Sequence, residues 1–413
     1  MRKLAAVALA LLVLAGALAA YALYRRQISR DHAGSASVEF VTTAVPKPLP
    51  ASSGIRWPTF AYDNERLHVA PGTVRPPFRR LWTAGGASLL EFPPAIAFRR
   101  LYLADASGNL IALSARSGAR AWIVRERRCV AASPAVNTQQ RGTVYETFLD
   151  RKPCRKNPAD GEVIAVATGT GKVRWRKHIG ASETSPLLIG NYLYVGDWQG
   201  TVWCLRIGTG ATVWTFKTGG PVKAAIASNG DRVFAASYDG HVYALNARTG
   251  KLIWKASGDP RFFGGHGTFY STPAVAYDRV YIGSTDGKVY SFGATSGKRR
   301  WSHSTGGYVY GSPAVWRREV LVGSYDHLFY AFDAATGRQL WRFHANGPIS
   351  GSPTVVDGVV YFATLAGRTY GLDARTGRQL WSFPDGRYTP VVTDGRRLYL
   401  NGYGKVYALA PLR

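Results

Sequence analysis

The chain has 413 residues, of which 46% are hydrophobic and 19% are charged, so it has enough apolar surface for a folded core and is not a disordered chain. Its 46 Gly, 22 Pro, 23 Tyr and 12 Trp with a single Met are typical of many short strands and turns, and exclude a mainly helical protein. Three Cys exclude a disulfide-dense scaffold, and the formal net charge of +27 predicts attraction to anionic partners.

The chain begins with an uncharged stretch, residues 4–24, between two basic pairs, Arg2-Lys3 and Arg25-Arg26. A membrane-spanning helix needs about 20 apolar residues, so we expect residues 1–30 to be a retained single-pass anchor. A cleaved signal peptide is the alternative, because Ala17-Leu18-Ala19 has the small residues of a cleavage site. Basic residues flank both ends, so charge leaves the orientation open.

Residues 31–72 are rich in Ser, Ala and Pro, with Pro46, Pro48 and Pro50 close together. This composition predicts an extended linker that holds the folded part away from the membrane. We therefore expect an anchor at residues 1–30, a linker at 31–72 and a folded domain at 73–413.

From residue 82 onward the chain repeats a small turn followed by a Trp, as in Thr249-Gly250 before Trp254. The Trp comes four residues after the Gly, and the period is about forty residues, which indicates a repeat architecture. The first copy lacks the turn but keeps the spacing. The eight repeated Trp residues are Trp82, Trp122, Trp175, Trp214, Trp254, Trp301, Trp341 and Trp381.

A second motif, usually Ser or Thr followed by Pro, marks the same eight units; Thr272-Pro273 is one copy and Ala224–Ile226 is a degenerate one. Pro has no backbone donor, so the motif predicts the start of a strand beside a central axis. Two apolar runs follow in each unit, joined by a hairpin signal such as Asp286-Gly287. Four short antiparallel strands per unit must pack on their neighbours around a ring, so the sequence predicts an all-β, eight-bladed β-propeller.

The last unit has material for only three strands after Trp381. We expect residues 79–83 to supply its fourth strand. Pairing the N- and C-terminal strands in one blade would close the ring and remove the open sheet edges.

Three runs, residues 244–254, 331–341 and 371–381, resemble the repeat of the pyrroloquinoline-quinone (PQQ) propeller family, and the resemblance extends over residues 57–413. It implies that the eight Trp side chains dock between adjacent blades. Residues 57–66 are similar to the segment before the first blade in the non-enzymatic branch of this family, which includes the lipoprotein of the outer-membrane barrel-assembly machine.

The enzymatic branch, the quinoprotein dehydrogenases, uses a bound Ca²⁺, a nearby catalytic Asp and commonly two adjacent Cys, whereas no two Cys are adjacent here. Glu91, Glu183 and Asp394 are scattered over different units and do not form the oxygen cluster that a hard cation needs. We therefore expect no catalytic, cofactor or metal site, and a membrane-anchored, extracytoplasmic scaffold that binds or assembles proteins in the cell envelope. A PQQ- and Ca²⁺-dependent oxidoreductase is the alternative.

The cysteines suggest a local cross-link. Cys129 and Cys154 lie on either side of the hairpin in the longest unit, and a disulfide would hold its polar insertion in an oxidising compartment. Two unrelated thiols are the alternative. Cys204 stands where other units have Ala, Ser or Gly, so we expect a small buried core residue.

The insertion also predicts a basic protrusion for anionic envelope polymers, formed by Arg151, Lys152, Arg155 and Lys156. Plain decoration of solvent-exposed faces by excess Arg is the alternative. The expected anchor and disulfide argue against nucleic acid as a partner.

Propellers commonly bind partners through loops at one mouth of the channel. The candidates are residues just ahead of the Pro motifs: Glu183, Lys223, Tyr270, Tyr308, Tyr310 and Tyr388. These aromatics could anchor a partner or simply fill the channel. His266, in a Gly-rich loop, is a further candidate, with simple solvent exposure as the alternative. We expect a monomer that reaches the membrane through its N-terminal helix and whose partners are other envelope proteins or anionic envelope polymers.

Overall fold

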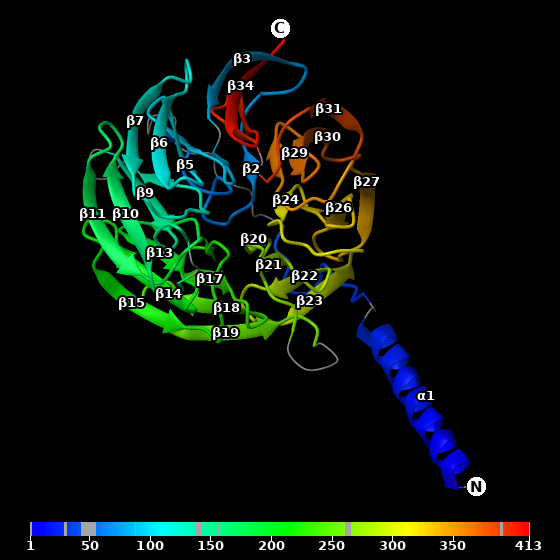
Figure 1. Cartoon of the computed structure of the whole chain (residues 1–413). Helices are drawn as coiled ribbons and strands as arrows, with labels where there is room; N and C mark the ends of the chain where they lie inside the picture. Colours follow the sequence, from blue (N-terminus) through cyan, green and yellow to red (C-terminus); the bar gives the residue numbers. More distant parts are fainter. Residues whose placement is uncertain are drawn as a thin grey trace.

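Eight small antiparallel sheets surround a common axis in the computed structural model (Figure 1), which describes residues 2–28, 31–42, 55–86, 88–137, 142–154, 157–260, 266–388 and 391–412. Each sheet contains a blade of four antiparallel strands that follow one another from the axis outward, and two of the sheets have a fifth strand from the N-terminal part of the chain. The predicted all-β, eight-bladed propeller with four-stranded blades is confirmed.

The first four blades are built from consecutive strands. Blade 1 contains β4 (Ala95–Ala97), β5 (Arg100–Asp105), β6 (Asn109–Ser114) and β7 (Arg120–Arg125). Blade 2 contains β8 (Ala135–Asn137), β9 (Thr143–Phe148), β10 (Gly161–Ala167) and β11 (Val173–Ile179). Blade 3 contains β12 (Leu187–Ile189), β13 (Tyr192–Gly196), β14 (Thr201–Arg206) and β15 (Thr212–Lys217). Blade 4 contains β16 (Ala227–Ser228), β17 (Arg232–Ala236), β18 (His241–Asn246) and β19 (Leu252–Ser257).

The remaining blades repeat the pattern, and the last one takes its outer strand from the N-terminal part of the chain. Blade 5 contains β20 (Ala274–Ala276), β21 (Arg279–Gly283), β22 (Lys288–Gly293) and β23 (Arg299–Ser304). Blade 6 contains β24 (Ala314–Trp316), β25 (Glu319–Gly323), β26 (Leu328–Asp333) and β27 (Gln339–His344). Blade 7 contains β28 (Thr354–Val356), β29 (Val359–Thr364), β30 (Arg368–Asp373) and β31 (Gln379–Phe383). Blade 8 contains β32 (Val392–Thr393), β33 (Leu398–Asn401), β34 (Lys405–Pro411) and β3 (Phe78–Gly85).

Ring closure occurs as predicted, because β3 pairs antiparallel with β34 and brings Trp82 opposite Ala408. The two strands lie side by side at the top of Figure 1. The Trp82 indole donates to the carbonyl of Ala115 in blade 1, 3.3 Å away, and so links the closing blade to the first one.

The repeated Trp side chains join neighbouring blades. Trp301 of blade 5 is fully buried, and its indole N–H donates to the carbonyl of Ala334 in blade 6 at 2.8 Å. Its ring lies against Gly337, whose φ of 74° and close approach both require glycine. The same indole bond to the next blade is made by Trp82, Trp122, Trp175, Trp214, Trp254 and Trp341. The junction of blades 7 and 8 differs, since Trp381 packs edge-on against Phe78 with ring centroids 5.3 Å apart.

The Ser/Thr-Pro motifs make a second set of links, close to the axis. The backbone N–H of Thr272 donates to the Ser312 hydroxyl at 3.0 Å, and that of Ser312 donates to the Ser352 hydroxyl at 2.9 Å. Each hydroxyl thus receives the equivalent backbone N–H of the preceding blade. This explains why the position ahead of Pro is usually Ser or Thr.

The N-terminal helix α1 (Arg2–Ile28) stands apart from the ring in Figure 1. In the described part of the chain, no helix combines the length and the apolar character that crossing a membrane requires. The structure therefore does not support the expected membrane-spanning helix.

The described parts of the expected linker lie against the propeller and not away from it. In residues 31–42, Glu39 accepts hydrogen bonds from the N–H and hydroxyl of Ser296, and Arg279 donates to the carbonyl of Val38 at 2.7 Å. Further on, β1 (Ile55–Trp57) pairs with β4, and β2 (Val69–Ala70) pairs with β28. Residues 43–54, which include Pro46, Pro48 and Pro50, lie outside the described residues.

Residues 57–70, which we call the channel segment, run along the inner strands. The inner strands have no inward neighbour of their own blade, so their free N–H groups need acceptors. Carbonyls of the channel segment accept these N–H groups at five blades, at N···O distances of 2.7–3.0 Å. The donor and acceptor residues are Val136 and Pro58, Ser228 and Asn64, Val275 and Glu65, Val315 and Leu67, and Val355 and His68. These backbone hydrogen bonds, which composition does not reveal, attach the channel segment to the inner strands.

Candidate functional site

The loops that enter the inner strands surround a cup at one end of the channel, which we call the channel mouth. Its volume is about 380 Å³, and its lining includes Lys223, Tyr270, Tyr310 and Tyr388, all of them predicted at this position. Tyr308 is 51% exposed and stands beside Tyr310, with ring centroids 5.7 Å apart, but does not line the cup.

Aromatic rings form a continuous wall on one side of the channel mouth. Tyr238, Tyr270, Tyr310 and Tyr325 follow one another with ring centroids 6.0, 5.4 and 5.0 Å apart. The sequence analysis missed Tyr238 and Tyr325, which come from the turns between the second and third strands and not from the entry loops. Both stand directly before the Asp of the hairpin turn, and that spacing could have identified them.

A charged cluster lies next to the aromatic wall. The Glu183 carboxylate pairs with Lys223 at 3.1 Å and accepts hydrogen bonds from the Trp198 indole at 2.7 Å and the Tyr270 hydroxyl at 3.3 Å. The Lys223 ammonium lies 4.1 Å from the centroid of the Trp198 ring. Burial, together with the charge of Glu183, raises the pKa of Glu91 on the same cup. The mouth therefore combines apolar rings with fixed charges, which suits recognition of a protein surface.

The floor of the channel mouth is closed by the channel segment. Phe60 lines the cup and packs against Phe92 with ring centroids 6.5 Å apart. Behind it, the Arg66 side chain is completely buried. Its guanidinium donates to the Thr59 hydroxyl and to the carbonyls of Phe60, Ser185, Pro186 and Ile226, at 2.5–3.4 Å.

Two further titratable groups of the channel segment are buried. Burial raises the pKa of Asp63 to about 7, and its Oδ1 accepts the N–H of Leu67 at 2.8 Å. Burial and the Arg66 charge lower the pKa of His68 to about 3, so its ring is neutral at neutral pH. Neither ring nitrogen of His68 has a hydrogen-bond partner in the described part of the chain.

Across the described residues, no three His, Cys, Asp or Glu side chains converge closely enough to hold a metal ion. Cys204 is buried in β14, and burial raises the pKa of its thiol to about 12, as suits an inert core residue.

The remaining predicted residues do not line the cup. Cys129 and Cys154 form a disulfide with Cα atoms 6.0 Å apart, and Arg151 and Lys152 beside it are exposed. Arg155 and Lys156 lie outside the described residues. His266 packs edge-on against His241 with ring centroids 5.5 Å apart, so it is not simply exposed.

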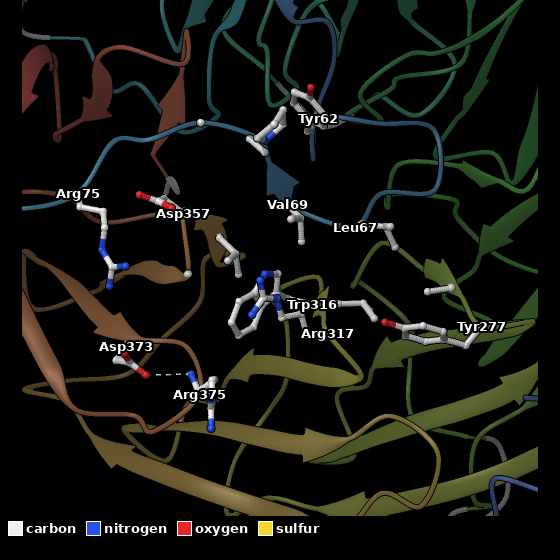
Figure 2. A pocket seen from close by; sticks show the side chains of 17 residues that line it. Tyr62, Leu67, Val69, Arg75, Tyr277, Trp316, Arg317, Asp357, Asp373 and Arg375 are labelled. Carbon is white, nitrogen blue, oxygen red and sulfur yellow. Dashed lines mark hydrogen bonds between the residues drawn. The ribbon is translucent and has the colours of Figure 1, made fainter. Parts of the chain in front are cut away.

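A second and larger pocket, of about 530 Å³, opens at the other end of the ring (Figure 2). Leu67 and Val69 of the channel segment and Trp316 of β24 line it, and Arg317 and Arg375 lie at its edge. The Arg317 guanidinium lies 5.0 Å from the centroid of the Trp316 ring. Sequence reasoning did not identify this pocket, because strand-end turns and the channel segment form it together.

Comparison with known proteins adds family information. A family model described as outer membrane protein assembly factor BamB matches residues 78–185, 159–312 and 305–412. The BamB of Bordetella pertussis is 29% identical over 48% of this chain and 50% of its own length. The BamB of Shewanella oneidensis is 30% identical over 43% of this chain and 45% of its own length. The chain thus spans about half the length of the curated relatives it matches.

Solved structures agree on the fold. The crystal structure of BamB from Moraxella catarrhalis has a TM-score of 0.66 and 20% identity, and the match covers 81% of this chain and 100% of that one. Quinohemoprotein alcohol dehydrogenase from Comamonas testosteroni has a TM-score of 0.70 and 14% identity, with 86% and 80% covered. At these identities both likenesses concern the fold alone.

Proposed function

Because the chain belongs to the family of outer membrane protein assembly factor BamB, we propose that it is a non-catalytic scaffold of the cell envelope that binds other envelope proteins at its channel mouth. The assembly role named for the relatives supports the envelope part of this proposal. The aromatic and charged lining of the channel mouth supports the proposed protein binding.

The observation that carries the proposal is the aromatic wall beside the Glu183 and Lys223 pair. Interface energy concentrates in a few large aromatic and charged side chains that lie in a recess. Here four Tyr rings from three blades share one cup with a fixed ion pair. Because the channel segment closes the floor, a partner would dock on the mouth and not thread through the ring.

The oxidoreductase alternative rests on the shared fold. Adding PQQ and Ca²⁺ to the purified chain tests it directly, since an oxidoreductase would acquire a bound chromophore and reduce a redox dye. We expect neither change, because no three His, Cys, Asp or Glu side chains of the described residues lie close enough together to hold the Ca²⁺. Dye reduction that requires both additions would contradict the scaffold proposal.

Two paired variants test the mouth. Tyr310→Ala with Tyr388→Ala removes two rings from the cup, whereas Val213→Ala with Leu252→Ala removes two exposed apolar side chains from outer strands. We expect the first pair to reduce co-purification of envelope proteins from native membranes at least tenfold, and the second pair to leave it unchanged. Equal recovery with both pairs would contradict the proposed contact surface.

The folding unit is also a proposal. We propose that it begins near residue 55 and not at 73, because β1 and β2 pair with blades 1 and 7. Limited proteolysis should therefore trim the chain to about residue 55 and leave the channel segment intact. Rapid cleavage within residues 57–70 would contradict this.

A further inference from the structure

The end of the propeller opposite the channel mouth carries two turns from each blade. In a four-stranded antiparallel blade, the turn between the first and second strands and the turn between the third and fourth strands lie at the same end. We call the end formed by these turns the turn face. The pocket in Figure 2 opens on it, because its lining includes such turns from blades 5, 6 and 7.

The turn face is strongly basic. In the described residues, exposed Arg and Lys side chains lie in or next to these turns in all eight blades: Arg99, Arg116, Arg120, Lys172, Arg206, Arg248, Lys251, Lys298, Arg317, Arg318, Arg338, Arg375, Arg378 and Arg396. These residues are dispersed along the sequence, and the repeat gathers them at one end of the molecule.

Acidic side chains on the same turns do little to balance this charge. Among the described acidic residues of these turns, Asp231 alone is exposed. Others are half-buried and serve the turn itself: Asp333 accepts the N–H and hydroxyl of Thr336 at 2.8 Å, and Asp373 does the same for Thr376 at 3.0 Å. Basic side chains therefore dominate the exposed charge of this face.

The distribution of this charge indicates the shape of the partner. The basic side chains are distributed around the axis, and all of them lie at the same end of the ring. This arrangement matches a flat, extended anionic surface better than a single acidic segment of a protein. Few large apolar side chains project from these turns; Phe98, 37% exposed, is one. Peripheral contact through charge, without deep insertion, fits both observations.

We propose that the turn face docks on the surface of an anionic lipid bilayer. The pocket beside Trp316 gives this surface one recess, which is lined by Arg75, Arg317 and Arg375 and by Asp357 and Asp373. The three guanidinium groups outnumber the two carboxylates, so the recess can take a headgroup phosphate. The proposal goes beyond the scaffold function, since it concerns the end of the ring opposite the mouth and would leave the mouth open to proteins.

The test compares two fourfold variants with equal loss of charge. Lys251→Gln, Lys298→Gln, Arg338→Gln and Arg378→Gln neutralise exposed turn-face residues that directly follow the turn Gly. Arg125→Gln, Arg127→Gln, Lys217→Gln and Lys405→Gln neutralise exposed residues at the mouth end, in or next to blades 1, 3 and 8. All proteins keep residues 2–28, so any contribution of α1 is common to them.

Co-sedimentation of the full-length proteins with vesicles of phosphatidylglycerol and phosphatidylcholine, and with phosphatidylcholine alone, measures docking. Each basic side chain that reaches the headgroups strengthens binding about fivefold, so we expect the turn-face variant to lose at least about tenfold in affinity for anionic vesicles. The mouth-end variant should lose less than about threefold, and added salt should weaken all anionic binding.

Three results would overturn the proposal. The first is equal loss in both variants, and the second is equal binding of wild type to the two kinds of vesicle. The third is binding to poly-L-glutamate without binding to anionic vesicles, which would assign the face to an acidic protein. Thermal unfolding by circular dichroism shows whether each variant is folded, and single-site Arg378→Gln and Arg125→Gln variants replace a fourfold variant that is not.

Discussion

Replacing Arg66 with Met should unfold the propeller at markedly lower denaturant concentration, because this side chain ties the channel segment to blades 3 and 4. Its guanidinium donates to four carbonyls and one hydroxyl, and none of these atoms is near bulk water, since the side chain is fully buried. The Pro186 carbonyl keeps the Thr59 hydroxyl as a donor, so four acceptors lose theirs. If each costs about 1 kcal/mol, the loss is about 4 kcal/mol before the relief from no longer burying a cation. We expect a net loss of about 3 kcal/mol in the free energy of unfolding.

The matched control is Arg56→Met, which removes an exposed Arg of β1, ten residues earlier in the sequence. Guanidinium unfolding followed by Trp fluorescence should give a lower midpoint for Arg66→Met with little change in slope, and an unchanged midpoint for Arg56→Met. A loss below about 1 kcal/mol for Arg66→Met, or equal losses for both, would refute the reasoning that the channel segment is part of the core.

Three further predictions concern stability. The pKa of Asp63 is about 7 in the folded state against an ordinary value of 3.8, so the folded protein keeps this proton over a pH range where the unfolded chain loses it, and the resulting stability is lost as pH rises through 7. Between pH 5 and pH 8 the free energy of unfolding of wild type should fall by about 2 kcal/mol relative to that of Asp63→Asn, measured by chemical unfolding. An equal pH dependence of stability in the two proteins would contradict this. Replacing Cys129 and Cys154 with Ser removes a cross-link between residues 25 positions apart and should lower the free energy of unfolding by about 3 kcal/mol, measured from the denaturant midpoint. An unchanged midpoint would show that the disulfide does not stabilise the fold. Gly337→Ala should cost at least about 1 kcal/mol more than Gly367→Ala, since both have φ near 75° but only the first would place a Cβ 2.7 Å from a Trp ring; equal melting shifts would disprove that the ring sets the cost.

The fold was predictable because the same sequence motifs occur in each of the eight repeat units. The spacing of Trp301 after its turn Gly recurs in the other units, and the family resemblance implied that this Trp docks between blades. The structure places its ring against Gly337 of the next blade. Ring closure by Phe78–Gly85 followed from counting strands. The entry-loop position of Tyr270 and Tyr310 followed from the Pro motifs.

Features that depend on a single copy could not be found in this way. The channel segment occurs once, and its pairing with inner strands uses backbone groups that any sequence possesses. The burial of Asp63 and Arg66 therefore left no trace in composition. The turn face was hidden for the opposite reason: Arg248 and Arg378 are 130 positions apart in sequence and share a face only once the ring closes.

The central claim is that the channel mouth, and not the outer edge of the ring, holds another envelope protein. A photo-crosslinking amino acid placed at Tyr310 in cells, and at Leu252 on the outer strand β19 as the control, tests it most directly. We predict a discrete adduct with an outer-membrane assembly protein from position 310 and none from position 252. The same adduct from both positions, or from position 252 alone, would contradict the claim.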